Sequence, residues 1–392
     1  MVKRLIAVLT FSVFILSIFT MSFAASSSKT IKIGVDLELS QAVAQYGQKE
    51  LEGLKLAIDE INQKGGIGGK KIDLVIVDNK SDKTEALNVA TKLAVREKVL
   101  AILGPATSGA TKSAASAAMK YKVPIISPSA TDDAVTVDER TGKTKAYVFR
   151  TCFNDSFQGN VMANFALKTL KAKNAAVVYE ASSDYSKGLY KNFKSTFTKG
   201  GGKIIAEEAF SKGEQDFSSI LTKIRDKKPD VIFAPVYYDE AGLIIKQARE
   251  LGMNMPILGG DGFDDPKVVE KAGKKFANNV FFSAHYSSQD TDVKVQEFIK
   301  KFKAKYKTEP NAFAALGYDL GYFIADALKR ANLKFDSIEK DRDRLRSALE
   351  NTRNFVGVTG IVNINKYHNA EKSAVIIELK DGIQKFKQKL NP

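Results

Sequence analysis

The chain has very little of the side-chain chemistry that enzymes and metal proteins use. Its 392 residues include one cysteine, two histidines and no tryptophan. The single Cys152 excludes an intramolecular disulfide, and neither a cysteine cluster nor a histidine pair with metal-ligand spacing occurs. A Gly-x-Ser-x-Gly nucleophile motif is also missing. The sequence therefore predicts no catalytic residues, no metal ligands and no cofactor, and it disfavours a secreted enzyme.

Two patterns that resemble functional motifs have a simpler interpretation. His285 lies at a strand end and His368 in a predicted turn, and we interpret both as structural. The stretch "GGIGGKK", Gly65 to Lys71, looks like a phosphate loop. A Walker A loop would need glycine where Lys64 stands and serine or threonine where Lys71 stands. These glycines follow a predicted helix, where glycine terminates helices.

Only one long hydrophobic run is present, and it lies at the N-terminus. Lys3 and Arg4 precede the apolar segment 5–19, and the small residues Ser22 and Ala24 follow it. This pattern predicts a secretory signal peptide, residues 1–24, cleaved after Ala24, and hence a periplasmic protein. The run is shorter than the ~20 residues of a spanning helix. An uncleaved anchor is the alternative, and no cysteine follows the predicted cleavage site to carry a lipid.

Acidic residues are too few to balance the basic ones, and the formal net charge is +15. The lysines are scattered along the chain and lack the arginine-rich or aromatic interleaving of nucleic-acid binders. We interpret the charge as a source of solubility and of attraction to anionic surfaces. No nucleic-acid partner is expected, although a polyanion remains the alternative.

The residues after the signal peptide are too many for one core, so two domains are expected. Short β-branched runs alternate with helical segments in two successive units, 31–149 and 150–280. This alternation predicts an α/β fold with parallel sheets covered on both faces. Ser81 is expected to cap the helix that follows it. Three helices are predicted near 290–307, 311–331 and 339–350, followed by a hairpin of segments 357–366 and 372–380.

Three aspartates lie together in the stretch "LGGDGFDDP", Leu258 to Pro266. Their spacing does not match an EF-hand loop. Asp265 directly precedes a proline, which predicts a helix N-cap followed by proline at the first helical position. Asp261 comes immediately after a predicted strand, where open parallel sheets bind ligands. Asp264 is expected to have neither role.

Several motifs occur in a fixed order between residues 31 and 380: "LSQAVAQYGQ", "FRTCFNDSFQG", "YSKGL", "DFSSILTKIRD" and "QARELG". Together they resemble the type I periplasmic binding proteins of branched-chain amino-acid ABC transporters. The resemblance implies two doubly wound α/β lobes joined by three crossover segments near 149, 283 and 356, with a ligand cleft between them. The N-terminal lobe would hold residues 30–149 and 284–356, and the C-terminal lobe residues 150–283 and 357–392.

The resemblance also carries the family's ligand shell onto eight positions: Tyr46, Ser108, Ser129, Thr131, Tyr185, Tyr237, Asp261 and Phe313. The serines and the threonine would hold the carboxylate of an amino acid near helix starts, where backbone N–H groups favour anions. Asp261 would pair with its ammonium. The aromatic rings would enclose its side chain.

Each of these positions also has a plainer interpretation. Ser108 and Thr131 could be only helix caps or turn residues, and Asp261 only a turn residue. Tyr46 and Tyr185 could be ordinary surface aromatics, and Tyr237 and Phe313 only core residues. The resemblance leads us to expect glutamate in the branched-chain binders where Asp261 stands, so the identity of the ligand stays open. In the motif "YSKGL", Ser186 also replaces a glycine.

The resemblance implies an extracytoplasmic substrate-binding component of an ABC transporter. Such a protein would bind a small, aliphatic amino acid by hinge closure and deliver it, as a monomer, to a permease in the inner membrane. The alternative is a sensory module that binds an amino acid or amide and signals its ligand-bound state to a membrane receptor. Both would bind the ligand with the same chemistry, so the sequence does not separate them.

Overall fold

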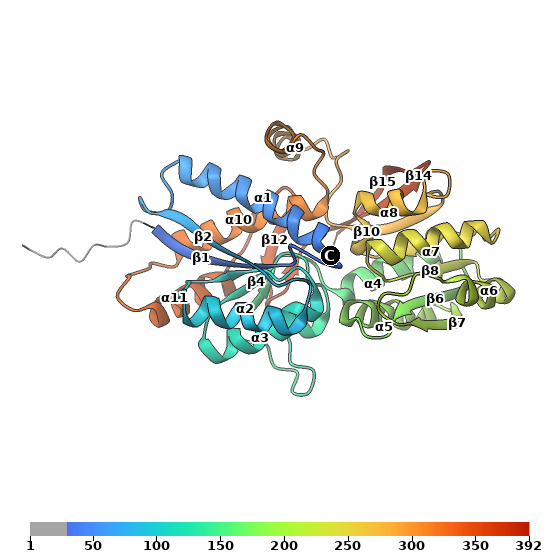
Figure 1. Ribbon diagram of the computed structural model, residues 1–392, viewed down its shortest axis with the longest axis horizontal. Coiled ribbons are helices and arrows are strands. Elements are labelled where there is room, and N and C mark those ends of the chain that lie inside the picture. The colour runs from blue at the N-terminus through green and yellow to red at the C-terminus, as the bar shows by residue number, and fades with distance from the viewer. Residues whose placement is uncertain (1–29, 392) are drawn as a thin grey trace, which may run out of the picture.

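A computed structural model describes residues 30–391 of the chain, so the predicted signal peptide lies outside the described residues. Two lobes lie side by side, and each has a central sheet with helices packed on its faces (Figure 1). The predicted α/β class with two lobes and parallel-dominated sheets is confirmed.

The first lobe is built on a five-stranded sheet in the order β2-β1-β3-β4-β5, in which every pair is parallel. Its strands are β1 (Thr30–Leu37), β2 (Lys71–Asp78), β3 (Ile102–Leu103), β4 (Ile125–Ser127) and β5 (Val148–Arg150). The connecting helices are α1 (Ala44–Gln63), α2 (Lys83–Val95) and α3 (Ser108–Tyr121). Every residue of β1 from Ile33 to Leu37 is buried, and because successive side chains point to opposite faces, both faces of this part of the strand are covered.

Three late helices complete this half of the molecule: α9 (Val293–Tyr306), α10 (Ala312–Arg330) and α11 (Ile338–Glu350). They confirm the predicted helices near 290–307, 311–331 and 339–350. α10 packs closely on α1, although the two are far apart in the sequence. A glycine permits this approach, because a Cβ added at Gly53 would lie 1.9 Å from the carbonyl oxygen of Ala314.

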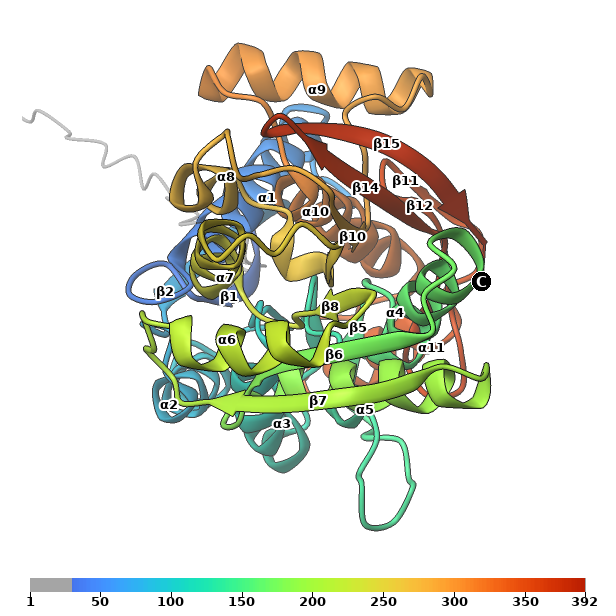
Figure 2. The ribbon, with the colours of Figure 1, turned by 90° about the vertical axis from the view of Figure 1, so that its right-hand side faces the viewer.

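The second lobe, which faces the viewer in Figure 2, has a seven-stranded sheet in the order β15-β14-β10-β9-β8-β6-β7. Its strands are β6 (Asn174–Glu180), β7 (Lys203–Phe210), β8 (Val231–Phe233), β9 (Ile257–Gly259), β10 (Val280–Ala284), β14 (Ala374–Lys380) and β15 (Ile383–Leu390). Its helices are α4 (Asp155–Asn164), extended by a π-helical turn (Phe165–Thr169), α5 (Asp184–Lys199), α6 (Ser218–Lys227), α7 (Tyr238–Glu250) and α8 (Pro266–Ala272). The pairs from β7 to β10 are parallel, whereas β14 joins β10 antiparallel.

A small third sheet holds β11 (Phe355–Gly357), β12 (Gly360–Ile364) and β13 (Ala370–Glu371). It packs on the first lobe: the Phe355 ring contacts Phe323 of α10, and the His368 ring stacks on Phe149 of β5 at 4.0 Å between ring centroids. The chain joins the seven-stranded sheet only after β13, at Ala374, which is later than the predicted crossing near 356.

The predicted hairpin of segments 357–366 and 372–380 is wrong. β12 pairs with β11 and β13, whereas β14 pairs with β10 and β15. Both segments carry the apolar pattern of a strand, but that pattern does not predict which strand each segment pairs with. The edge of β10 accepts β14 because the chain crosses back to the second lobe between β13 and β14.

The expected cap of α2 is also wrong by one residue. Asp82, not Ser81, caps the helix, and its carboxylate accepts hydrogen bonds from the Thr84 and Glu85 backbone N–H groups. Ser81 adopts a left-handed backbone conformation, with φ of 57°, and its hydroxyl donates to the Ser40 carbonyl oxygen instead. Aspartate and serine are equally good caps, so the turn before the helix decides between them.

Candidate functional site

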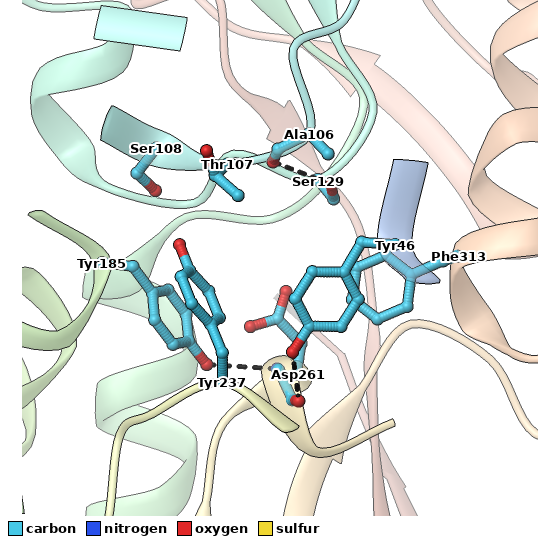
Figure 3. Close-up of a pocket in the computed structure, with 10 residues that line it drawn as sticks. Tyr46, Ala106, Thr107, Ser108, Ser129, Tyr185, Tyr237, Asp261 and Phe313 are labelled. Atoms are coloured by element: carbon cyan, nitrogen blue, oxygen red, sulfur yellow. Dashed lines mark hydrogen bonds between the residues drawn. The ribbon is translucent and has the colours of Figure 1, made fainter. Parts of the chain in front are cut away.

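A small pocket lies between the lobes and is lined by residues of both. Its lining comprises Tyr46, Ala106, Thr107, Ser108, Ser129, Tyr185, Tyr237, Asp261, Gly262 and Phe313 (Figure 3). The fold therefore brings together every predicted site residue except Thr131. Thr131 is fully buried outside this lining, and its carbonyl oxygen accepts a hydrogen bond from the Asp155 backbone N–H.

Hydroxyl groups and the start of α3 form one side of the pocket, because β3 and β4 both end there. Ser108 is the first residue of α3, and its hydroxyl accepts a hydrogen bond from the Asp132 N–H at 3.1 Å. The free N–H groups of a helix's first turn make this side suitable for an anion. Ser129 follows β4, and its hydroxyl contacts Glu50 and the Ala106 carbonyl oxygen.

Two buried glutamates behind this wall were not anticipated from the sequence. Burial holds the pKa of Glu50 well above its ordinary value. A protonated Glu50 can donate to Ser129 Oγ while that hydroxyl donates to Ala106, and it adds no charge that would repel an anion. Glu38 accepts hydrogen bonds from the Ala106 and Thr107 N–H groups at 2.9 and 3.0 Å. Its position directly after the first predicted strand was the available signal.

Aromatic rings form two walls that face each other across the pocket. Tyr46 stacks on Phe313 with 4.2 Å between ring centroids, and Tyr185 stacks on Tyr237 at 4.9 Å. Figure 3 shows these pairs on opposite sides, with the hydroxyl-bearing wall and Asp261 closing the two remaining sides. The two pairs touch at one point, because the Tyr46 and Tyr237 rings meet edge to face with 5.5 Å between their centroids.

Asp261 is the carboxylate of the second lobe that lines the pocket. It begins a short 3-10 turn directly after β9 and is almost completely buried. Its Oδ2 lies 3.2 Å from Nε2 of His285, whereas Oδ1 has no hydrogen-bond partner among the described residues. His285 follows β10, the neighbour of β9 in the sheet. The sequence placed His285 at a strand end as a structural residue, and its contact with Asp261 follows from the sheet order.

The other two aspartates of the stretch Leu258 to Pro266 have different roles. Asp265 caps α8, with its carboxylate accepting a hydrogen bond from the Lys267 N–H at 2.8 Å, which confirms the predicted cap. Asp264 does not line the pocket. It is buried, accepts a hydrogen bond from Gln384 Nε2 at 2.9 Å, and has a pKa that burial raises to about 7.

Direct hydrogen bonds join the lobes across the cleft. The Tyr46 hydroxyl donates to the Gly262 carbonyl oxygen at 2.6 Å and accepts from the Tyr238 N–H at 3.0 Å. The Tyr238 hydroxyl donates to the Ala42 carbonyl oxygen at 2.8 Å. Lys83 pairs with Asp184 at 2.7 Å nearer the surface. These contacts hold the lobes in a closed arrangement, with the pocket shut between them.

Two other kinds of functional feature were sought in residues 30–391. Over this range, no group of three or more His, Cys, Asp or Glu side chains could hold a metal ion. No helix of this range is long and apolar enough to cross a membrane.

Residues 30–384 match the sequence model of the periplasmic binding protein family. The chain belongs to this family. It is also similar to the branched-chain amino-acid transporter substrate-binding protein LivJ from Streptococcus pneumoniae, whose structure contains isoleucine. That similarity has a TM-score of 0.84 and 40% identity, and it covers 93% of this chain and 100% of that one. The resemblance noted in the motifs and the two-lobed fold are thereby confirmed.

Two further relatives show the range of ligands among similar binding proteins. The Leu/Ile/Val-binding protein BraC3 of Rhizobium johnstonii is 32% identical over 275 residues, which are 70% of this chain and 73% of BraC3. A solute-binding protein of an ABC transporter from R. palustris, solved with benzoate, is 26% identical with a TM-score of 0.82. The match covers 93% of this chain and 97% of that protein.

Proposed function

We propose that this protein is the extracytoplasmic substrate-binding component of an ABC transporter and that it binds a small aliphatic amino acid. The ligand would lie in the pocket between the lobes and pass to a permease in the inner membrane. The arrangement of polar groups carries the proposal: hydroxyls and a helix start face a lone carboxylate, Asp261, across an aromatic enclosure. The names of the relatives, which include an isoleucine complex, support the same ligand class.

The ligand's two charges explain why the polar groups lie at opposite sides. An amino acid that leaves water keeps both a carboxylate and an ammonium, and an unpaired buried charge is very costly. Ser108 and the start of α3 suit the carboxylate, whereas the unpartnered Oδ1 of Asp261 suits the ammonium. The rings of Tyr46, Phe313, Tyr185 and Tyr237 would then surround the aliphatic side chain. Thr131, whose buried hydroxyl has no hydrogen-bond partner within residues 30–391, would contribute to the carboxylate side of this shell.

The site acts in this proposal by binding and releasing, and it performs no reaction. The protein would work as a monomer in the periplasm after removal of residues 1–24. N-terminal sequencing of the exported protein is expected to begin at Ala25, because the small residues Ser22 and Ala24 end the apolar run. A soluble exported protein that keeps Met1 would contradict this cleavage.

Identification of the ligand is the direct test. Protein purified from its native compartment is denatured, and the released small molecule is identified by mass spectrometry. We expect leucine, isoleucine or valine. Calorimetric titration of ligand-free protein with these amino acids, alanine and benzoate gives the order of affinities. Tight binding of benzoate with no binding of any amino acid would overturn the proposal, because benzoate has no ammonium to pair with Asp261.

A further inference from the structure

We infer that His285 is a positioning residue for the ligand's ammonium: it donates its Nε2–H to Oδ2 of Asp261 and so leaves Oδ1 directed at the ligand. This inference rests on the proposed function, because it takes Asp261 as the partner of an ammonium. It goes further by assigning a role to a residue that does not line the pocket itself.

The sheet order places the two side chains together. β9 and β10 are parallel neighbours, paired at Gly259 and Phe282, and each ends at the same edge of the sheet. Asp261 follows β9, and His285 follows β10. Their side chains are 4% and 1% exposed, and Nε2 lies 3.2 Å from Oδ2.

The imidazole ring is fixed on a second side. The Phe153 ring stacks on it with 3.7 Å between centroids and 22° between the ring planes. Phe153 follows β5 and belongs to the segment that leads from the first sheet into the second lobe. A ring held in this way presents Nε2 in one direction, so the hydrogen bond fixes the rotation of the Asp261 carboxylate.

The chemistry of the pair decides which group donates. An ionised carboxylate can only accept, so Nε2 carries the proton. Burial lowers the pKa of His285 to about 4, although the hydrogen bond to Asp261 acts in the opposite direction, so the ring is neutral near pH 7. Its Nδ1 has no partner among residues 30–391, which agrees with a neutral ring protonated only at Nε2.

Neutrality matters for an ammonium site. A lysine, arginine or protonated histidine at this position would cancel the negative charge of Asp261 and oppose a cationic ligand group. A neutral donor orients the carboxylate and leaves its charge available. Oδ1 is then a buried oxygen to which no residue of the range 30–391 donates, which is costly unless a ligand supplies the donor.

Matched variants test this role through leucine and isoleucine affinity. In His285→Gln the amide nitrogen can occupy the place of Nε2, whereas His285→Leu keeps an apolar side chain and loses the donor. We expect His285→Leu to weaken binding by about tenfold or more, as for loss of a hydrogen bond to a charged group. His285→Gln is expected to stay within a few-fold of the natural protein. Circular dichroism and thermal unfolding check that each variant is folded.

The double variant separates positioning from packing. If His285 acts through Asp261, then His285→Leu has no further effect on affinity once Asp261→Asn is present. Additive losses, or equal losses in His285→Leu and His285→Gln, would overturn the inference and assign His285 to packing. Leucine affinity of His285→Leu within twofold of the natural protein would also overturn it. If Asp261→Asn binds leucine as tightly as the natural protein, Asp261 is not the partner of the ammonium, and the inference about His285, which rests on that pairing, fails with it.

The tautomers give a readout that is independent of affinity. The chain has only two histidines, so nitrogen NMR of histidine-labelled protein yields two assignable rings. His368 Nδ1 lies 3.0 Å from the Val148 carbonyl oxygen and is expected to carry its proton on Nδ1. His285 is expected to be protonated on Nε2 at pH 7, with a shift of that signal when leucine binds. A His285 ring protonated on Nδ1 alone would contradict the inference.

Discussion

At the scale of single residues, the unpartnered Oδ1 of Asp261 gives the sharpest prediction. Asp261→Ala leaves the ligand's ammonium buried without its partner. Removing one member of such a pair costs roughly 2–5 kcal/mol, or roughly 30-fold to several thousand-fold in affinity. Calorimetric titration with leucine, isoleucine, valine and alanine measures the loss. Unchanged affinity for the best ligand would show that Asp261 does not meet an ammonium.

Asp264 provides a prediction about pH, because burial raises its pKa to about 7. The folded protein therefore binds a proton at Asp264 that the unfolded chain releases near pH 4. Between pH 4 and pH 7 this favours unfolding as the pH rises, by an amount on the order of a few kcal/mol. Asp264→Asn stays neutral and can still accept the Gln384 hydrogen bond.

We expect Asp264→Asn to show a smaller decline of the free energy of unfolding between pH 4.5 and pH 8 than the natural protein shows. Urea unfolding of both proteins at the two pH values measures the difference. The natural protein and the variant are compared because Glu240 and Asp265 also have raised pKa values, about 7 and about 6, and contribute to the decline in both proteins. Parallel declines would show that Asp264 does not titrate in this range.

At the scale of elements, the cap of α8 can be separated from the ligand site only four residues earlier. Asp265→Ala removes the acceptor of the Lys267 N–H and is expected to lower the free energy of unfolding by about 1 kcal/mol. Affinity is expected to stay nearly intact, because Asp265 does not line the pocket. Asp265→Asn keeps an acceptor and serves as the matched control.

Urea unfolding and leucine titration of these two variants measure both effects. A loss of affinity in Asp265→Ala that matches the loss in Asp261→Ala would mean that the cap, not the Asp261 carboxylate, organises the loop. Equal stability of Asp265→Ala and the natural protein would mean that α8 does not depend on its cap.

At the scale of the whole molecule, ligand binding is expected to close the lobes. The chain passes between the lobes after β5, after β10 and before β14, and bonds such as Tyr46 to Gly262 and Tyr238 to Ala42 form only when the lobes meet. Closure without a ligand buries the Asp261 charge unpaired, which favours an open form. Small-angle scattering should therefore show a smaller radius of gyration with saturating leucine. An unchanged radius would argue for a rigid cleft.

The sequence by itself determined the features that depend on neighbours along the chain. The alternation of short apolar strands with helices gave the α/β class, and the Asp265–Pro266 pair gave the start of α8. Both predictions succeed because a helix cap or an apolar repeat depends on only a few neighbouring residues. The motif resemblance extended this to candidate site residues, and all but Thr131 of them line one pocket.

The tertiary structure decided which distant segments meet. β14 pairs with β10 and not with β12, and His285 reaches Asp261 because β10 lies beside β9. The Tyr46 hydroxyl bonds the other lobe's backbone, which no pattern around residue 46 indicates. Strand order, lobe closure and burial depend on contacts between segments that are far apart in the sequence. Local periodicity predicts each segment but does not predict which segments pair. Sheet order therefore decided that His285 is the partner of the Asp261 carboxylate, whereas the sequence by itself placed Asp261 at a strand end.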